Sequence, residues 1–317
     1  MGIYLGIDTS NYTTSCALLD TDKRQILSMK KLLPVKKGER GLRQSDAVFH
    51  HTVQLPALMR DLFDNQEFRN IRPEAVCYSR SPRLTEGSYM PCFLVGKCVG
   101  ESVAAANGIE VYSTSHQIGH ILAALYSCGR LDLIKKGEPF LAFHVSGGTT
   151  DLLLCKYDSE NILDITEVGT SLDLKAGQCI DRLGVKLGLD FPCGAELEKL
   201  ASKSSRKFKI KPTIKDCSCC LSGLENKFTD MLKSGESSED TAKFCLDFIY
   251  ENISAMTKNA LEKYGDMPVI FAGGVMSDKL IKDRLMAEFR CFFAEPQLSC
   301  DNAVGVAVYA ALKRGMI

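Results

Sequence analysis

Apolar and polar positions follow the same plan near the start of each half of the chain. Residues 3–20, with the sequence IYLGIDTSNYTTSCALLD, and residues 140–157, with the sequence FLAFHVSGGTTDLLLCKY, each place a short polar turn between two apolar runs. Apolar runs on both sides of such a turn are typical of a β-hairpin. The repeated plan predicts two α/β lobes, residues 1–136 and residues 137–317, that face a cleft, with a single doubly wound domain as the alternative.

Segments with helical spacing of apolar residues follow each hairpin, and short buried strands lie between them. Ser45 and Asp46 form a cap signal before the first amphipathic run, and Gly108 is placed to end the second, as expected at helix termini. This alternation places both lobes in the α/β class. The predicted helices are residues 45–65, 91–108, 176–188, 240–265 and 301–315, the last capped by Asp301, and the predicted buried strands are residues 73–79, 109–115 and 268–275.

Composition and charge exclude several classes of function. The 317 residues carry 39 basic and 39 acidic side chains, so the chain alone is not an electrostatic binder of nucleic acid and would need a local patch or a partner for RNA. The longest apolar runs are far too short to cross a bilayer, and the first residues do not resemble a signal peptide. These features predict a cytoplasmic protein without a membrane role, whose 14 cysteines stay reduced.

One dense cysteine cluster, with the sequence CSCC, occupies residues 217–220. It contains a single C-x-x-C pair and no second pair, which argues against a structural zinc site. A tight turn of small residues is the favoured interpretation, with a redox role or adventitious metal capture as alternatives.

Two of the five histidines, His116 and His120, are four residues apart in the run TSHQIGHILAALYSC. On a helix they would share one face, while the isoleucines and leucines of the same run would gather on the opposite side. Two imidazoles at this spacing can converge on one metal ion. They are not a complete site, and from this run alone a polar helix face explains them equally well.

Two glycine-rich turns are candidates for phosphate binding. Gly147 and Gly148 lie in the turn VSGGTTD, and Gly273 and Gly274 follow a buried strand in FAGGVMSDK. Glycines allow the backbone to approach a phosphate and to point N–H groups at it, although plain turns have the same appearance. Asp181, in the helical run CIDRLG, is placed either to hold ribose hydroxyls or to pair with a nearby cation.

The order of several motifs resembles the tRNA threonylcarbamoyladenosine transferase family, which is TsaD-like and was formerly called Gcp or O-sialoglycoprotein endopeptidase. The resemblance implies a two-lobed actin/Hsp70-like ATPase fold, the ASKHA fold. The older peptidase label has no support, because no glutamate base of an H-E-x-x-H motif lies between the two histidines. The motifs, in order, are LGIDTS, SHQIGH, HVSGGTTDL, VGTSLDLKAGQCIDRLGVKLGLDFPCG, LSGLENKF, FAGGVMSDKL and CDNAVGVA.

The resemblance also implies a divalent metal, iron or zinc, and an adenine nucleotide as cofactors. The family's metal ligands are two histidines of an H-x-x-x-H helix and an aspartate near the C-terminus, which match His116, His120 and Asp301. The metal would bridge the two lobes and contact the nucleotide. The family's nucleotide-binding positions match His144, Val145, Ser146, Gly147, Gly148, Asp181, Gly194, Gly274 and Asp278, the last in place of the usual asparagine that contacts the base.

The chain departs from the family pattern around the reacting centre. Thr13 stands where the family has a glutamate, Thr149 replaces the histidine after the two glycines, and Leu174 replaces the second aspartate of an I-D-D motif, although Asp173 remains. In the first lobe SPRL, residues 81–84, replaces GPG. These changes suggest a divergent paralogue, and no catalytic residue is assigned.

The resemblance implies a metal-dependent transferase that moves a threonylcarbamoyl or related carbamoyl group from an adenylate to an acceptor. For the family that acceptor is tRNA, delivered with the help of partner subunits in a hetero-complex. A nucleotide- and metal-binding ATPase or regulatory partner without tRNA modification activity is the alternative. The basic stretch at residues 203–215 could follow RNA phosphates, or could be a solvated hairpin edge.

Overall fold

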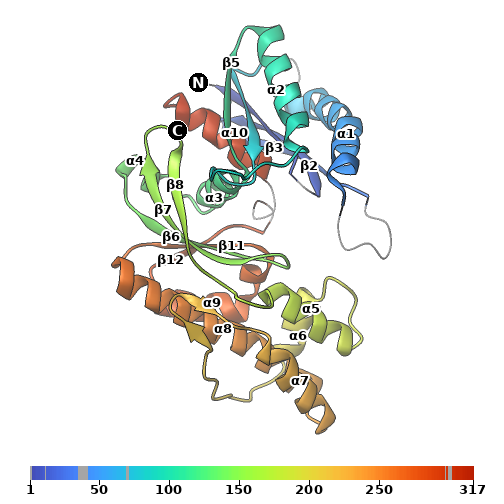
Figure 1. Ribbon diagram of the computed structural model, residues 1–317, viewed down its shortest axis with the longest axis vertical. Coiled ribbons are helices and arrows are strands. Elements are labelled where there is room, and N and C mark those ends of the chain that lie inside the picture. Colours follow the sequence, from blue (N-terminus) through green and yellow to red (C-terminus); the bar gives the residue numbers. More distant parts are fainter. Residues whose placement is uncertain (1, 11, 35–41, 69–70, 297, 299–301) are drawn as a thin grey trace. The chain divides into compact units, whose positions relative to one another are not determined.

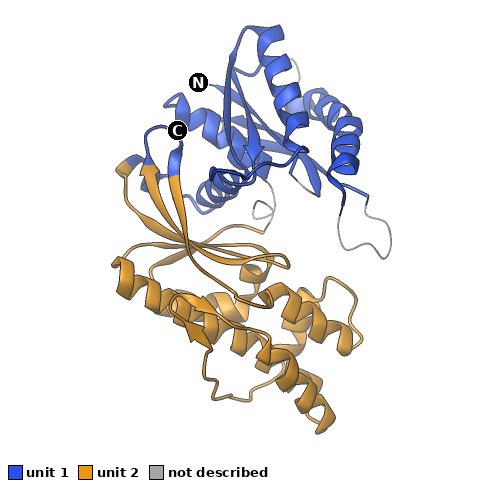
Figure 2. Ribbon diagram, in the orientation of Figure 1, with its two compact units in different colours: residues 1–135, 158–163, 297–317 blue, residues 136–157, 164–296 orange. Residues whose placement is uncertain are grey.

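The chain divides into two compact units, which Figure 2 shows in different colours. The structure, a computed structural model, describes all residues except 1, 11, 35–41, 69–70, 297 and 299–301. Within those described residues, no helix is both long and apolar enough to span a membrane. Unit 1 comprises residues 1–135, 158–163 and 297–317, and unit 2 comprises residues 136–157 and 164–296.

Unit 1 is a five-stranded sheet with helices on both faces (Figure 1). The strand order is β3-β2-β1-β4-β5, in which β1 pairs antiparallel with β2 and parallel with β4, and β4 pairs parallel with β5. The elements of unit 1 are β1 (Ile3–Asp8), β2 (Thr13–Asp20), β3 (Gln25–Leu32), α1 (Gln44–Asp64), η1 (Gln66–Phe68), β4 (Ala75–Ser81), α2 (Phe93–Asn107), β5 (Glu110–Ser115), α3 (His116–Ser127), α4 (Asp132–Lys136) and α10 (Asn302–Lys313).

Alternation along β1 separates the two faces of this sheet. Leu5 and Ile7 join a buried cluster with the helices of one face, including Leu55 of α1. Gly6 points to the other face, where a Cβ would collide with the backbone of Ala303 in α10. The missing side chain therefore lets α10 lie directly on the central strand.

Helix α10 belongs to unit 1, whereas the sequence pattern placed all of residues 137–317 in the second lobe. Residues 302–311 are all buried. A Cβ on Gly305 would collide with the carbonyl of Gly119, so α10 and α3 approach closely. A helix that is apolar on all sides must be covered on all sides, and its periodicity does not indicate which lobe covers it.

Unit 2 repeats the plan of unit 1. Its five-stranded sheet has the order β12-β11-β6-β7-β8, in which β6 pairs antiparallel with β7 and parallel with β11, and β11 pairs parallel with β12. The elements are β6 (Phe140–Val145), β7 (Thr150–Asp158), β8 (Ile162–Thr170), α5 (Ala176–Lys186), α6 (Gly194–Ala201), β9 (Ile214–Lys215), β10 (Ser218–Cys219), α7 (Gly223–Lys233), α8 (Ser238–Tyr264), β11 (Val269–Ala272), η2 (Gly274–Ser277), α9 (Lys279–Glu288) and β12 (Cys291–Phe293).

The core of unit 2 lies between its sheet and helices α5 to α8. Phe143 and Val145 of β6 and Leu152 of β7 pack with Phe228 of α7 and Phe248 of α8, all fully or almost fully buried. This layer fixes the strand ends from which the glycine-rich turns extend.

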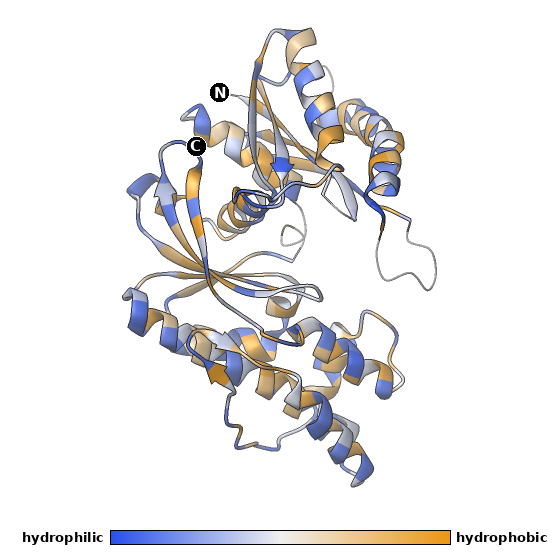
Figure 3. Ribbon diagram, viewed as in Figure 1, coloured by the Kyte–Doolittle hydropathy of each residue, from blue (hydrophilic) through white to orange (hydrophobic). Residues whose placement is uncertain are grey.

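Each predicted segment agrees with one of these elements or hairpins to within a few residues. Both predicted hairpins are present, as β1–β2 and β6–β7. The alternation of hydrophobic and hydrophilic residues along α1 is visible in Figure 3. The predicted helices correspond to α1, α2, α5, α8 and α10, and the predicted strands to β4, β5 and β11. The expected cap, Asp301, lies outside the described residues.

The cysteine cluster at 217–220 forms a small hairpin rather than an isolated turn. Ser218 pairs with Lys215 and Cys219 with Ile214, and Asp216 at the bend has a φ of 55°. Burial raises the pKa of the Cys219 thiol to about 12, which makes it a poor nucleophile. Every described cysteine is a free thiol.

Candidate functional site

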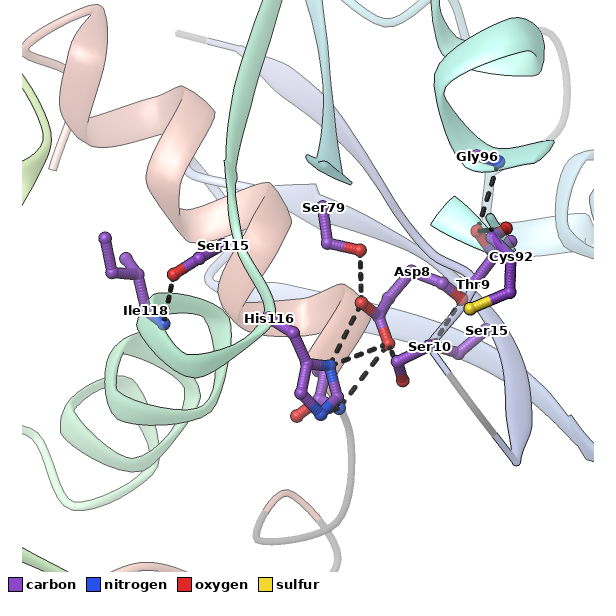
Figure 4. Close-up of polar contacts among 11 residues, drawn as sticks. Asp8, Thr9, Ser10, Ser15, Ser79, Cys92, Gly96, Ser115, His116 and Ile118 are labelled. Atoms are coloured by element: carbon purple, nitrogen blue, oxygen red, sulfur yellow. Dashed lines mark hydrogen bonds and ion pairs between the residues drawn. The ribbon is translucent and has the colours of Figure 1, made fainter. Parts of the chain in front are cut away.

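The most buried charge at the carboxyl edge of the unit 1 sheet is Asp8, the last residue of β1, which is 1% exposed. Figure 4 shows its carboxylate surrounded by donors. Ser10 Oγ donates to Oδ2 over 2.6 Å, Ser79 Oγ donates to Oδ1, and His116 Nδ1 lies 3.2 Å from both oxygens. The carboxylate is thus bound by side chains from the β1–β2 connection, from β4 and from α3.

These side chains meet because the parallel strands β1, β4 and β5 end at the same edge of the sheet. Ligands of open α/β sheets bind at this edge. Ser115, the last residue of β5, caps helix α3 by accepting a hydrogen bond from Ile118 N at 3.2 Å. The cap starts the helix immediately after the strand, which places His116 in its first turn.

The environment of Asp8 favours its ionised form. Burial alone would raise the pKa of Asp8, but the neighbouring His116, and hydrogen bonds from His116, Ser10 and Ser79, lower it to about 2. A buried carboxylate that accepts several hydrogen bonds is expected to behave in this way. Asp8 therefore supplies a fixed negative charge beside the imidazole.

The two histidines lie together on the polar face of α3. Their ring centroids are 4.6 Å apart, and their planes are inclined by 77°. Ile118, Ile121 and Leu122 of the same helix are buried, as the helical spacing predicts. The structure therefore brings both predicted metal ligands to one place.

Asp8 orients His116 in the way that a metal ligand requires. A metal-binding histidine commonly donates its second ring N–H to a carboxylate, which fixes the tautomer. With Nδ1–H directed at Asp8, the lone pair of the His116 ring is on Nε2, and Asn302 Nδ2 lies 3.2 Å from it. The residues present therefore fit a divalent ion at Nε2, although the described residues contain no group of three acidic, histidine or cysteine ligands. The third predicted ligand, Asp301, lies outside the described residues.

Asn302, the first residue of α10, contacts the same imidazole. Its Nδ2 lies 3.2 Å from His116 Nε2, which accepts when Nδ1 carries the proton, 2.9 Å from Nδ1 and 3.5 Å from Asp8 Oδ2, and its Oδ1 has no hydrogen-bond partner among the described residues. A buried amide oxygen without a partner is costly. A hydrogen-bond donor of a ligand, or a cation bound with it, would satisfy this oxygen.

A second buried network lies under α1. Thr14 Oγ1 donates to Gln54 Oε1 over 2.9 Å, so it can only accept from His51 Nδ1, which lies 2.8 Å away. His51 is fully buried, and its Nε2 has no partner in the described part of the chain. Burial lowers the pKa of His51 to about 4, while the Asp8 charge opposes this shift. The ring is therefore neutral at physiological pH.

In unit 2 the glycine-rich turn after β6 is closed by its own hydroxyl groups. Ser146 Oγ accepts from the N–H groups of Gly148 and Thr149 at 3.2 Å, and Thr149 Oγ1 lies 3.3 Å from His144 Nδ1. A Cβ on Gly147 or on Gly148 would meet nothing within 4 Å. The turn therefore presents open backbone where a ligand could approach.

Two other segments pack against this turn. A Cβ on Gly177, in the first turn of α5, would lie 2.7 Å from the N of Gly147. Gly273, with a φ of 99°, precedes Gly274, and a Cβ on it would collide with the carbonyl of Val145. The predicted phosphate-binding glycines and a helix N-terminus are thus neighbours, an arrangement that suits an anion.

The other nucleotide positions form a second group in unit 2. Asp181 Oδ1 accepts from Cys193 N at 3.0 Å, which places it next to Gly194 at the start of α6. Asp278 caps α9 by accepting from Ile281 N at 3.1 Å. Burial, opposed in part by backbone hydrogen bonds, raises the pKa of Asp278 to about 6.

The sites of departure have definite structural roles. Asp173 accepts from Leu221 N at 2.7 Å and from Ser222 Oγ at 2.6 Å, so the aspartate that remains anchors a neighbouring segment. Thr13 opens β2. Thr149 takes part in the turn described above.

Sequence reasoning did not single out Asp8, Ser79, His51 or Asn302. The motif LGIDTS offered one signal, since a polar residue that ends the first strand of an α/β sheet lies at the ligand-binding edge. The other three are recognised only through contacts between distant segments.

Comparison with curated proteins gives matches along nearly the whole chain. A tRNA N6-adenosine threonylcarbamoyltransferase of Aromatoleum aromaticum is 28% identical over 323 residues, covering 98% of this chain and 90% of that protein. One of Streptococcus pneumoniae is 29% identical over 321 residues, covering 97% and 91%. A probable bifunctional tRNA threonylcarbamoyladenosine biosynthesis protein of Thermoplasma acidophilum is 24% identical over 315 residues; the chain spans 56% of its length.

Solved structures share the fold at low sequence identity. Component A of (R)-2-hydroxyglutaryl-CoA dehydratase from Acidaminococcus fermentans has a TM-score of 0.56 and 15% identity, covering 99% of this chain and all of that one. HypF of T. kodakarensis has a TM-score of 0.60 and 10% identity, covering 98% of this chain and 47% of that one. The predicted actin/Hsp70-like ATPase fold is confirmed.

The family description for TsaD, tRNA N6-adenosine threonylcarbamoyltransferase, matches residues 26–308. This range includes the histidine helix, both glycine-rich turns and most of α10. The chain therefore belongs to the tRNA N6-adenosine threonylcarbamoyltransferase family.

Proposed function

We propose that this chain is a metal-dependent transferase that moves a threonylcarbamoyl or related carbamoyl group from an adenylate to an adenosine of tRNA. The observation that carries the metal part is the contact between the buried Asp8 carboxylate and His116, with His120 beside it. Family membership supports the reaction class, and the names of the relatives favour transfer over a purely regulatory role.

His116 and His120, together with Asp301, would hold the divalent ion, iron or zinc. Bound there, the ion would polarise a carbonyl or phosphoryl oxygen. Asp8 keeps His116 in the tautomer that has its lone pair on Nε2, where the ion would replace the Asn302 amide, and the hydroxyls of Ser10 and Ser79 hold the carboxylate in place. All the described residues of this group belong to unit 1.

The adenine nucleotide would bind to unit 2. The backbone of Gly147 and Gly148 would lie against its phosphates, with Gly274 beside them. Asp181 and Gly194 would contact the ribose and nucleoside, and Asp278 the base. The open space at both turn glycines supports this assignment, because no heavy atom lies within 4 Å of a Cβ placed on either.

A basic segment of unit 2 supports an RNA acceptor. Lys207, Lys209 and Lys211 are exposed, while the intervening Phe208 and Ile210 are half-buried. The inward rings fix the segment: Phe208 contacts Phe244 of α8 edge to face, with centroids 5.2 Å apart. Alternation directs the lysines outward together, which suits a polynucleotide backbone. Partner subunits of a hetero-complex would complete the delivery of tRNA.

Complementation tests the proposed reaction. The chain would be expressed in cells depleted of their own transferase, and threonylcarbamoyladenosine in total tRNA would be measured by mass spectrometry. Restored modification is expected with the wild-type chain and not with His120→Ala. Equal modification with both would remove the histidines from the mechanism, and folded wild-type protein that restores nothing would argue against the tRNA reaction in those cells.

A further inference from the structure

The connection between β4 and α2 contains a charged hollow that the proposed transfer does not use. It has a volume of about 250 Å³ and is formed by the end of β4 and the loop that follows it. We call it the Arg80 pocket. Its polar and aromatic lining residues are Arg80, Ser81, Arg83, Thr85, Ser88 and Tyr89.

The loop around the pocket is held by its own hydrogen bonds. Ser81 Oγ donates to the carbonyl of Arg83 over 2.8 Å, and Ser88 Oγ accepts from Arg83 N at 3.1 Å. Ser88 N in turn donates to the carbonyl of Thr85 over 3.1 Å. The pocket is thus a defined feature of the backbone.

The loop is also attached to the helix that carries the metal-ligand candidates. The N–H of Gln117 donates to the carbonyl of Pro82 over 3.0 Å. Gln117 directly follows His116, and Ser81 pairs with Ser115 across the ends of β4 and β5. The Arg80 pocket therefore lies beside the first turn of α3, within unit 1.

The charge of the pocket is one-sided. Two guanidinium groups line it, and no carboxylate does. Both arginines are exposed, and Arg80 forms no ion pair with an acidic residue in the described chain. Guanidinium groups bind phosphate through paired N–H donors and remain charged at any working pH. An anion with several acceptor oxygens is therefore the ligand that this lining favours.

Tyr89 adds a feature that a simple anion would not need. Its side chain is 61% exposed although the ring is large and mostly apolar. Exposed aromatic rings beside basic side chains are characteristic of surfaces on which nucleobases stack. The segment is also one in which this chain differs from the family pattern, since SPRL stands in place of GPG.

We propose that the Arg80 pocket binds a nucleotide, with its phosphate on Arg80 and Arg83 and its base against Tyr89. The nucleotide can belong to a polynucleotide strand or be free in solution. The proposal rests on the proposed transferase function only in the expectation that the nucleotide belongs to RNA. The binding itself requires neither the metal nor the transfer reaction.

Fluorescence anisotropy with a labelled single-stranded RNA, measured across salt concentrations, tests the proposal, and unlabelled AMP and GMP serve as competitors. The variant Arg80→Gln/Arg83→Gln should lose about tenfold or more in affinity for the RNA. The slope of its log affinity against log salt concentration should correspond to about one to two fewer phosphate contacts. Tyr89→Ala should weaken binding about 5- to 100-fold, whereas Tyr89→Phe should bind like the wild type.

Arg60→Gln/Arg72→Gln removes two exposed guanidinium groups elsewhere in unit 1 and is the matched control. If AMP or GMP displaces the RNA from the wild-type protein but not from the Arg80→Gln/Arg83→Gln variant, the pocket binds free nucleotide. RNA binding that depends on both arginines without such competition would assign it to a strand. The proposal is overturned if neither probe binds, or if both double variants bind alike. The His120→Ala variant should keep this binding, which separates it from a failure of transfer.

Discussion

Nδ1 of His116 lies 3.2 Å from both carboxylate oxygens of Asp8, although 108 positions separate the two residues in the chain. The contact joins the end of β1 to the start of α3, and with Nδ1–H directed at Asp8 the lone pair of the ring is on Nε2, 3.2 Å from Asn302 Nδ2. One buried carboxylate therefore determines how a candidate metal ligand is presented.

Replacing this carboxylate should weaken metal binding. Asp8→Asn keeps the size of the side chain but removes the charge that holds His116 in one tautomer. Loss of such a supporting carboxylate typically costs about 10- to 100-fold in metal affinity, measured here by competition with a chelator. Asp20→Asn is the control, because Asp20 is also buried at a strand end but accepts from the N–H groups of Asp22 and Lys23. Wild-type affinity in Asp8→Asn would contradict the role given to this contact.

His51 should make unit 1 less stable in acid. The pKa of His51 is lowered to about 4 in the folded state, against 6.5 for the unconstrained side chain. Between these values the unfolded state binds more protons, so the contribution to stability is present above pH 6.5 and is lost as the pH falls toward 4. The loss between pH 7.5 and pH 4.5 should be about 2–3 kcal/mol.

Urea unfolding at several pH values, with hydrogen exchange of the α1 amides as the probe, would measure this loss of unfolding free energy. His51→Gln should flatten the acid side of the stability profile, whereas substitution of the adjacent residue, His50→Gln, should not. A profile that keeps its slope in His51→Gln would show that other groups cause the acid sensitivity.

Asp278 should have the opposite effect in unit 2. Its folded pKa is raised to about 6 from 3.8, so the native state binds more protons in this interval and stability rises as the pH falls through it. Asp278→Asn retains an N-cap oxygen and removes the buried charge. It should stabilise unit 2 by about 1–3 kcal/mol at pH 7.5, with a smaller gain at pH 4.5. Asp283→Asn, an exposed position on the same helix, should show no such trend in urea unfolding.

The two glycines at the interface of the turn and α5 should respond differently to a methyl group. Gly147→Ala enters open space, so unfolding free energy should change little, while adenine-nucleotide affinity should fall about tenfold as a phosphate N–H contact is blocked. Gly177→Ala places a carbon 2.7 Å from the Gly147 nitrogen and should cost about 1–3 kcal/mol of stability. Calorimetric titration and urea unfolding separate these effects. Unchanged nucleotide affinity in a folded Gly147→Ala protein would remove the turn from the nucleotide site.

Local pattern was sufficient for the two hairpins, for the longest helices and for the histidine face, because period-two and period-3.6 spacing directly reflect which side of an element is buried. The shorter helices α6, α7 and α9 were not predicted. The hairpin that begins at Ile3 and the shared face of His116 and His120 are examples. The packing of α10 on unit 1 could not be derived in this way, since a helix buried on all sides carries no directional signal.

The polar contacts of the site could not be predicted from the spacing of apolar residues either. Asp8, Ser79 and His116 meet only because three parallel strands end in register. The tautomer of His51 follows from the hydrogen bond that the Thr14 hydroxyl donates to Gln54. That hydrogen bond exists only in the folded core. Resemblance to a family supplied ligand positions, but the residues that support them emerged from tertiary contacts.

The most direct test of the central claim is transfer by the purified protein. Threonylcarbamoyl-adenylate carrying radiolabelled threonine would be incubated with tRNA, a divalent metal and the family-type partner proteins. We expect the label to appear on adenosine after nuclease digestion with the wild-type chain, and to be reduced at least about 100-fold in a folded His116→Ala/His120→Ala variant. Label that never reaches the tRNA, or that reaches it equally with both proteins, would contradict the account.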